Sequence, residues 1–303
     1  MTVTDGPLEW LALARGTLDR AAERRRDDAW LAAAWDDPRT RVLAVHEGRA
    51  PVVHEPAPAL VFVPPAQAPD GDRLFLGVDA DGTAYFAVAG DVAVEGADRA
   101  GLRRVGAVLG DRDSGLLTHA VALQHWHATH RFCPRCGAGT RVAQGGHVRV
   151  CPRDGAQQFP RVDPAVIMLV TDPDDRVLLA RGPQWPADRR SILAGFVEPG
   201  ESLEQAVARE VHEEVGLHVR DVRYLGSQPW PMPQSLMLGF TAATDETALR
   251  PDQEEIVDAA WYTRDDLRSA LDAGDIVAPG PLSIAAQLIM RWYGGELPNM
   301  PPF

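Results

Sequence analysis

Apolar residues recur in short runs along the first part of the chain. The runs RVLAVHEG, APALVFV, RLFLGVD and TAYFAVAG lie within residues 1–115, and Gly, Pro and Asp separate them. Runs bounded in this way predict strands joined by turns. Two other stretches predict helices: Leu8 to Arg26, whose charged side chains we expect on a solvated surface, and Leu116 to His130.

A second alternation of apolar and polar positions begins at Arg161. The runs DPAVIMLVTD, RVLLAR, VRYLGSQPW and SLMLGFTAAT predict strands, and PLSIAAQLIMRWYGG has the apolar spacing of a helix. A further helix is predicted after Gly195. Strands with helices on both sides predict an α/β/α sandwich for this part of the chain.

Composition narrows the class of protein. The 303 residues suffice for two domains, and 45% hydrophobic and 24% charged residues are ordinary for a globular protein. The net charge of −13 argues against a general nucleic-acid binder, which usually carries a basic face. No apolar run approaches the ~20 residues of a membrane span, and the N-terminus lacks a secretory signal pattern. The three closely spaced cysteines favour a metal site in a reducing cytoplasm.

The predicted helix after Gly195 carries a cluster of acidic residues. Glu210, Glu213 and Glu214 stand at i, i+3 and i+4, so their carboxylates share one helix face. Like charges repel there, whereas Mg²⁺ binds carboxylate oxygens together with substrate phosphates. An ordinary solvated acidic face is the alternative. Ser202 with Gln205 forms the pattern of a capping box, and Gly216 suits the left-handed end of the helix, so both helix termini are predicted.

The cysteines form a small module of their own between residues 131 and 160. Cys133 and Cys136 make a C-x-x-C knuckle, and Cys151 opens a second C-P-R-x-G knuckle with Asp154 at the position of a fourth cysteine. Since carboxylate oxygen can bind Zn²⁺, a Cys₃Asp zinc site is one prediction. His147 is a second candidate for the fourth ligand, and a ribbon without metal is the alternative.

The segment SQPWPMPQS, from Ser227 to Ser235, follows the acidic helix. Its three prolines restrict the backbone to an extended form. Trp230 offers a flat face on which a base or nicotinamide ring can stack, and Gln228, Gln234 and Ser235 offer hydrogen-bonding groups. A rigid crossover loop with a buried tryptophan is the alternative.

Together these motifs resemble the NADH pyrophosphatase branch of the Nudix hydrolases, which includes enzymes that remove NAD caps from RNA. Met232 departs from that branch, whose motif is S-Q-P-W-P-F-P-x-S; methionine keeps apolar bulk but loses ring stacking. The signature positions of the Nudix box are all filled, by Gly195, Glu201, Arg209, Glu210, Val211, Glu213, Glu214, Gly216 and Leu217.

The resemblance implies an α+β protein with three parts. It implies a degenerate Nudix-like domain over residues 1–128, a zinc-ribbon-like module over 129–160 and a catalytic Nudix domain over 161–303. Members of the branch are homodimers whose sites draw on both subunits. They hydrolyse the pyrophosphate of NAD(H) to AMP and nicotinamide mononucleotide, with Mg²⁺ or Mn²⁺ as the catalytic cation and structural Zn²⁺ in the ribbon.

The resemblance also implies roles for individual residues. Glu210 and Glu214 are expected to bind the catalytic metal with the backbone carbonyl of Ala194, and Glu213 to act as general base or third ligand. Glu201 and Arg209 are expected to pair and orient the loop. Glu255 is expected as a further metal ligand, with Glu254 as the alternative. The residues expected to line the substrate site are Arg103, Phe159, Phe196, Gln228, Pro229, Trp230, Pro231, Met232, Pro233, Gln234, Ser235 and Ala285.

The sequence is also compatible with two other functions. The same Nudix chemistry could act on another nucleoside diphosphate derivative, such as ADP-ribose, although SQPWPMPQS argues against it. A non-catalytic nucleotide or RNA sensor is the remote alternative, because the glutamate set is complete and the chain is acidic.

Overall fold

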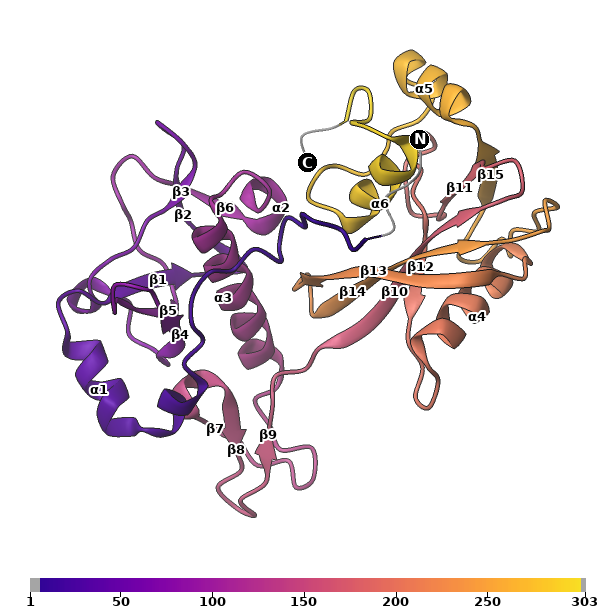
Figure 1. Ribbon diagram of the computed structural model, residues 1–303. Helices are drawn as coiled ribbons and strands as arrows, with labels where there is room; N and C mark the ends of the chain where they lie inside the picture. The colour runs from indigo at the N-terminus through magenta and orange to yellow at the C-terminus, as the bar shows by residue number, and fades with distance from the viewer. Residues whose placement is uncertain (1–5, 301–303) are drawn as a thin grey trace. The chain divides into compact units, whose positions relative to one another are not determined.

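The computed structural model describes residues 6–300 of the chain and divides it into two compact units (Figure 1). Of the described residues, the C-terminal unit contains 6–14, Asp163–Pro229 and 235–300, and the N-terminal unit contains Arg15–Val162 and Trp230–Gln234. Residues 1–5, which belong to the stretch searched for a secretory signal, lie outside the described residues, as do residues 301–303. None of the helices within residues 6–300 is long and apolar enough to cross a membrane.

A mixed sheet forms the centre of the C-terminal unit, and it contains the strands predicted from the alternation after Arg161. Its strand order is β13-β14-β10-β11-β15, with β12 also paired to β10. Strand β10 runs parallel to β14 and antiparallel to β11 and β12. The strands are β10 (Asp163–Thr171), β11 (Val177–Arg181), β12 (Leu193–Phe196), β13 (Arg220–Trp230), β14 (Ser235–Ala243) and β15 (Asp258–Tyr262).

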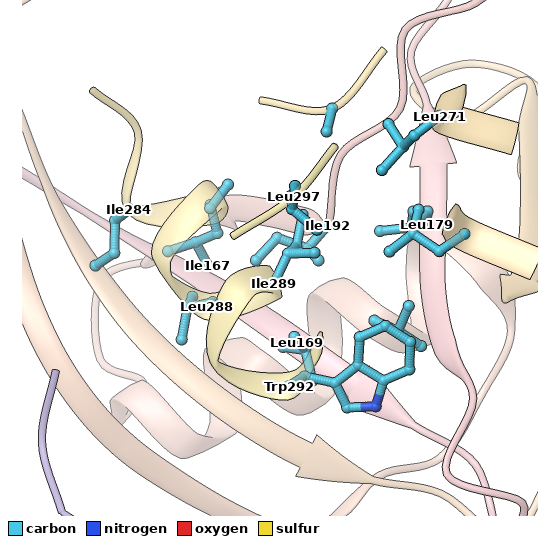
Figure 2. Packing of buried hydrophobic residues seen from close by; sticks show 14 of the residues in the cluster. Ile167, Leu169, Leu179, Ile192, Leu271, Ile284, Leu288, Ile289, Trp292 and Leu297 are labelled. Carbon is cyan, nitrogen blue, oxygen red and sulfur yellow. The ribbon is translucent and has the colours of Figure 1, made fainter. Parts of the chain in front are cut away.

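Alternation along β10 builds a hydrophobic core on each side of this sheet, because successive side chains point to opposite faces. Val166 and Met168 join the cluster under helix α4 (Leu203–Val215). Ile167 and Leu169 join the opposite cluster, which helices α5 (Arg264–Ala273) and α6 (Ile284–Tyr293) cover (Figure 2). The predicted α/β/α sandwich is therefore confirmed.

The N-terminal unit contains two three-stranded sheets, ordered β1-β5-β4 and β3-β2-β6, and a further small sheet, β7-β8-β9. The predicted helix Leu116 to His130 is confirmed up to Thr129, as part of a longer helix, α3, for which His130 is the C-cap. The run APALVFV is a strand over only two of its residues. The elements are η1 (Ala22–Arg26), α1 (Asp28–Asp36), β1 (Arg41–Val45), β2 (Arg49–Val53), β3 (Ala59–Leu60), η2 (Pro65–Gln67), β4 (Leu74–Val78), β5 (Ala84–Ala89), β6 (Asp98–Gly101), α2 (Leu102–Val105), α3 (Asp111–Thr129), β7 (Arg141–Ala143), η3 (Gln144–Gly146), β8 (Val148–Val150) and β9 (Gln157–Gln158).

The predicted helix from Leu8 to Arg26 is wrong, because only the turn η1 at its end is helical. Two of its backbone N–H groups bond instead to strands distant in sequence: the Leu8 N–H donates to the Leu225 carbonyl, and the Asp19 N–H donates to the Val78 carbonyl. Pairing with existing strands satisfies these two N–H groups, and tertiary context of this kind overrides local propensity.

Candidate active site

Both ends of helix α4 are fixed as the sequence predicts. The Ser202 hydroxyl accepts a hydrogen bond from the Gln205 N–H at 3.2 Å, and the Gln205 side chain accepts one from the Ser202 N–H at 2.8 Å. Gly216 ends the helix with φ of 72°, in the left-handed region that favours glycine. The apolar face packs on the sheet through Ala206, Val207, Val211 and Val215.

The three glutamates of the cluster lie in different environments. Glu210 and Glu214 are buried, with exposed fractions of 7% and 5%, whereas the Glu213 side chain is 60% exposed. Glu210 and Glu214 lie on the side of α4 that faces the sheet. Glu213, one position before Glu214, faces solvent. Two buried carboxylates on one face are costly unless a cation compensates them.

Arg209 links this cluster to the loop before the helix. Its guanidinium binds both carboxylate oxygens of Glu201, at 2.7 and 3.1 Å, so the expected pair of Glu201 and Arg209 forms, in bidentate geometry. It also donates to Glu210 at 2.9 Å, to Glu213 at 3.1 Å and to the Phe196 carbonyl at 2.8 Å. Hydrogen bonding to Arg209 lowers the pKa of Glu201. Arg209 thus holds the loop, strand β12 and the acidic face together.

Glu214 has the most perturbed carboxyl of the site. Burial first, and then the charges of Glu210, Glu255, Asp252 and Glu213, raise its pKa to about 8. One of its carboxylate oxygens, Oε2, is buried and has no hydrogen-bond partner. A buried, unpartnered oxygen among other carboxylates suits a hard divalent cation, since such ions take oxygen ligands. The residues present therefore fit Mg²⁺ or Mn²⁺.

Strand β12 lies against the acidic face at Gly195. A Cβ atom at this position would lie 1.9 Å from Glu210 Cδ, so only glycine leaves room for the carboxylate. Ala194, the residue expected to offer a backbone carbonyl, immediately precedes it and pairs with Ile167 of β10. The strand thus brings the predicted carbonyl residue next to the predicted metal ligands.

The loop that carries Glu255 is attached to the end of α4. The Asp252 N–H donates to the Glu214 carbonyl at 3.2 Å, and the Asp252 carboxylate accepts from the N–H groups of Glu254, Glu255 and Ile256. Asp252 was missed by the sequence analysis. Its spacing, three residues before Glu255, is the signal of a side chain that caps a turn.

Two residues expected at the substrate site make internal contacts instead. The Gln228 side chain is fully buried; it accepts from the Leu13 N–H at 3.3 Å and donates to the Leu282 carbonyl at 3.0 Å. The Ala285 side chain lies in the core cluster beneath α6. We correct the expectation for these two side chains, because internal packing uses the groups that a ligand would need.

The other expected substrate residues are distributed between the two units. Phe196 and Ser235 belong to the C-terminal unit, and Arg103, Phe159 and Trp230–Gln234 belong to the N-terminal unit. Phe159 and Phe196 are 63% and 58% exposed, which leaves both rings free to stack. The Arg103 guanidinium lies 5.6 Å from the centre of the Trp230 ring, a cation–π contact that holds the indole.

The cysteine module has two knuckles of the same design. The Cys133 N–H donates to the Ala138 carbonyl and the Cys151 N–H to the Ala156 carbonyl, in matching turns. The ligand atoms of Cys133, Cys136, Cys151 and Asp154 all lie within 4.8 Å of one another, a donor set that fits Zn²⁺.

His147 is wrong as a candidate fourth ligand of the ribbon. Its Nε2 donates to the Phe75 carbonyl at 2.9 Å. It is not a member of the group of ligand atoms around the cysteines. The position of the ring depends on this hydrogen bond to a strand distant in sequence, so the spacing from the cysteines did not predict it.

Comparison with known families covers most of the chain. The NADH pyrophosphatase-like rudimentary NUDIX domain matches residues 30–126, the NADH pyrophosphatase zinc ribbon domain matches 128–159, and the NUDIX domain matches 161–279. The α+β class and this order of domain types are therefore confirmed.

Individual relatives agree with these family matches. The NAD-capped RNA hydrolases NudC of Mycobacterium bovis and Mycobacterium tuberculosis are each 44% identical to the chain over 313 residues, which cover 94% of this chain and 95% of theirs. The human NAD-capped RNA hydrolase NUDT12 is 41% identical over 196 residues, which cover 61% of this chain and 42% of its own. The chain therefore belongs to the NADH pyrophosphatase branch of the Nudix hydrolases, together with the NudC enzymes.

Proposed function

We propose that this protein hydrolyses the pyrophosphate bond of NAD(H) to give AMP and nicotinamide mononucleotide, and that it makes the same cut at the NAD cap of RNA. The observation that carries the proposal is the cluster of acidic side chains around Glu214, whose Oε2 is buried and has no hydrogen-bond partner. The relatives named NAD-capped RNA hydrolases support the choice of substrate.

Glu210, Glu214 and Glu255, with the Ala194 carbonyl, are the proposed ligands of Mg²⁺ or Mn²⁺. Such a cation offsets the negative charge of the pyrophosphate and makes coordinated water more acidic. The raised pKa of Glu214, caused mainly by burial, supports this assignment, because a cation would stabilise the ionised form.

The chain's own residues supply positioning and a proton acceptor. Arg209 holds Glu201 and Glu210 in place, and Gly195 admits the Glu210 carboxylate. Glu213, which is exposed, is proposed to accept the proton of the attacking water or to serve as third ligand. The water oxygen forms a bond to one phosphorus, the bridging P–O bond breaks, and each product leaves as a monophosphate.

Recognition of the dinucleotide is proposed to use Trp230 and its neighbours. The indole can stack on a base or nicotinamide ring, with Arg103 against its other side. The remaining members proposed to line this site are Phe159, Phe196, Pro229, Pro231, Met232, Pro233, Gln234 and Ser235. Met232 provides apolar contact in place of a ring.

Several further features are proposed from the same family resemblance. Cys133, Cys136, Cys151 and Asp154 would hold structural Zn²⁺, for which their clustered donors are suitable. The domain boundaries 1–128, 129–160 and 161–303 remain predictions. A homodimer in the cytoplasm is proposed as the working form.

A substrate panel tests this function. We expect kcat/KM for NADH, NAD⁺ and NAD-capped RNA to exceed that for ADP-ribose, with AMP as a product of the two free dinucleotides. A higher kcat/KM for ADP-ribose would transfer the assignment to another nucleoside diphosphate derivative. Tight RNA binding without turnover of any substrate would favour a sensor.

A further inference from the structure

A cavity of about 390 Å³ in the N-terminal unit concentrates positive charge in an acidic chain. Arg49, Arg99, Arg103 and Arg104 line it, together with His125 and Met232. The chain as a whole carries a net charge of −13, so its average surface repels a polyanion. A pocket of this size can hold a nucleotide.

Three of the arginines are available to a ligand. Among residues 6–300, Arg49 and Arg103 have no ion pair with a carboxylate, and both are exposed. Arg104 pairs with Asp98 through its Nη1 at 2.7 Å, but its side chain is 59% exposed and a guanidinium has five N–H donors, so it can also bind a ligand. Arg99 pairs with Asp91. Guanidinium groups bind phosphate oxygens in bidentate geometry, which makes phosphate the chemistry that this pocket fits best.

The cavity adjoins Trp230–Gln234, the part of SQPWPMPQS that belongs to the same unit. Met232 lines it, and His125 Nδ1 lies 3.2 Å from the Pro233 carbonyl oxygen, so that α3 holds the segment beside the arginines. The tight turn between β1 and β2 also lines the cavity, and there Gly48 has φ of 70° and its N–H donates to the Gln124 side chain at 3.1 Å. The arginines therefore lie on rigid elements.

We propose that this cavity binds the phosphodiester backbone of the single-stranded RNA that follows an NAD cap. The inference rests on the function proposed above. Free NAD(H) carries only the pyrophosphate, whose charge the metal site offsets, whereas a capped RNA continues from the adenosine ribose as a chain of further phosphates. Those phosphates are the ligands for Arg49 and Arg104, with Arg103 between the cavity and Trp230.

The test compares two substrates in one set of variants. In the double variant Arg49→Gln/Arg104→Gln, we expect kcat/KM for an NAD-capped RNA to fall about tenfold, through KM, while kcat/KM for NADH stays within about twofold. Loss of two phosphate contacts should also reduce the slope of log affinity against log salt by about 1.4. Arg41→Gln is the matched control, because Arg41 is an exposed arginine that begins β1 as Arg49 begins β2.

Glu47 provides a test in the opposite direction. It is the acidic residue that lines the cavity, so Glu47→Gln should tighten RNA binding about twofold to threefold. Binding of a single-stranded RNA with a 5′-monophosphate, measured by fluorescence anisotropy, reports on the cavity without any turnover. It therefore tests the cavity even if the wild-type protein fails to cleave NADH.

The outcomes separate cleanly. Equal losses for NADH and capped RNA would assign the cavity to the dinucleotide and overturn the proposal. Unchanged capped-RNA kinetics and unchanged anisotropy in the double variant would overturn it as well. Selective loss with capped RNA, together with tighter binding by Glu47→Gln, would support it.

Discussion

Gly195 and Glu210 fit so closely that a Cβ on residue 195 would lie 1.9 Å from Glu210 Cδ. The glycine of the Nudix box thus has a steric reason in this chain: strand β12 must pass directly over a carboxylate of the acidic helix. Arg209 fixes the same contact from the other side, since it binds both Glu210 and the Phe196 carbonyl.

Replacing Gly195 with alanine should displace the Glu210 carboxylate. We expect kcat/KM for NADH to fall by about 100-fold, because displacement of a catalytic group by about 1 Å costs that much. Steady-state kinetics measure the loss. Gly295→Ala is the control, since a Cβ there meets nothing within 4 Å. Full activity of Gly195→Ala would show that Glu210 can move without consequence.

Asp154 should be a zinc ligand. We expect about one Zn²⁺ per chain in the purified protein, and a loss of affinity of at least about tenfold in Asp154→Ala. Asp154→Cys should retain the metal. Elemental analysis after dialysis against a chelator measures occupancy, with exposed Asp174→Ala as the control. Equal zinc content in wild type and Asp154→Ala would remove Asp154 from the site.

A group of partly buried histidines should make the fold sensitive to acid. Burial lowers the pKa of His147 to about 4, and burial also lowers the pKa values of His119 and His127. Between the ordinary histidine pKa of about 6.5 and the folded value, only the unfolded chain takes up the proton at His147. This contribution to stability is therefore complete above about pH 6.5 and is lost as the pH falls towards 4.

His147→Gln tests this pH dependence. Glutamine can still donate to the Phe75 carbonyl but does not titrate. We expect the free energy of unfolding of the variant to fall less steeply between pH 6.5 and pH 4, by about 1–3 kcal/mol over that range. Urea unfolding at a series of pH values measures this free energy. His46→Gln is the control, because His46 is exposed. The same decrease in the free energy of unfolding between pH 6.5 and pH 4 in His147→Gln and wild type would contradict the prediction.

Trp230 should contribute to substrate binding through its ring. Stacking of a base on an aromatic side chain is worth about 1–3 kcal/mol, so Trp230→Ala should raise KM for NADH by about tenfold or more. Trp230→Phe should keep most of the affinity, and kcat should change little in either variant. An unchanged KM in Trp230→Ala would restore the alternative of a purely structural tryptophan.

Local patterns made the acidic helix predictable. The capping box at Ser202, the left-handed Gly216 and the i, i+3, i+4 spacing each depend on a few neighbouring residues, so the sequence is sufficient to locate them. The strand alternation of β10 was equally readable, because its two faces bury separate clusters.

Features that depend on distant segments were not predictable in the same way. The segment from Leu8 pairs with Leu225 instead of forming a helix, and Gln228 hydrogen-bonds to Leu13 and Leu282 instead of remaining available to a ligand. The different burial of Glu213 and Glu214 follows from how α4 lies on the sheet. Such long-range pairings leave no mark in local spacing.

The most direct measurement is AMP release from NADH by the wild type and by Glu214→Gln, with Mg²⁺ or Mn²⁺ and with EDTA. Wild type should release AMP only with the cation, and the variant should lose this activity by at least about 100-fold, because it removes one charged oxygen from the proposed metal site. A thermal melt in EDTA should show Glu214→Gln at least as stable as wild type, since it replaces a buried carboxyl that ionises unfavourably. Metal-dependent AMP release at the wild-type rate by Glu214→Gln would contradict the account.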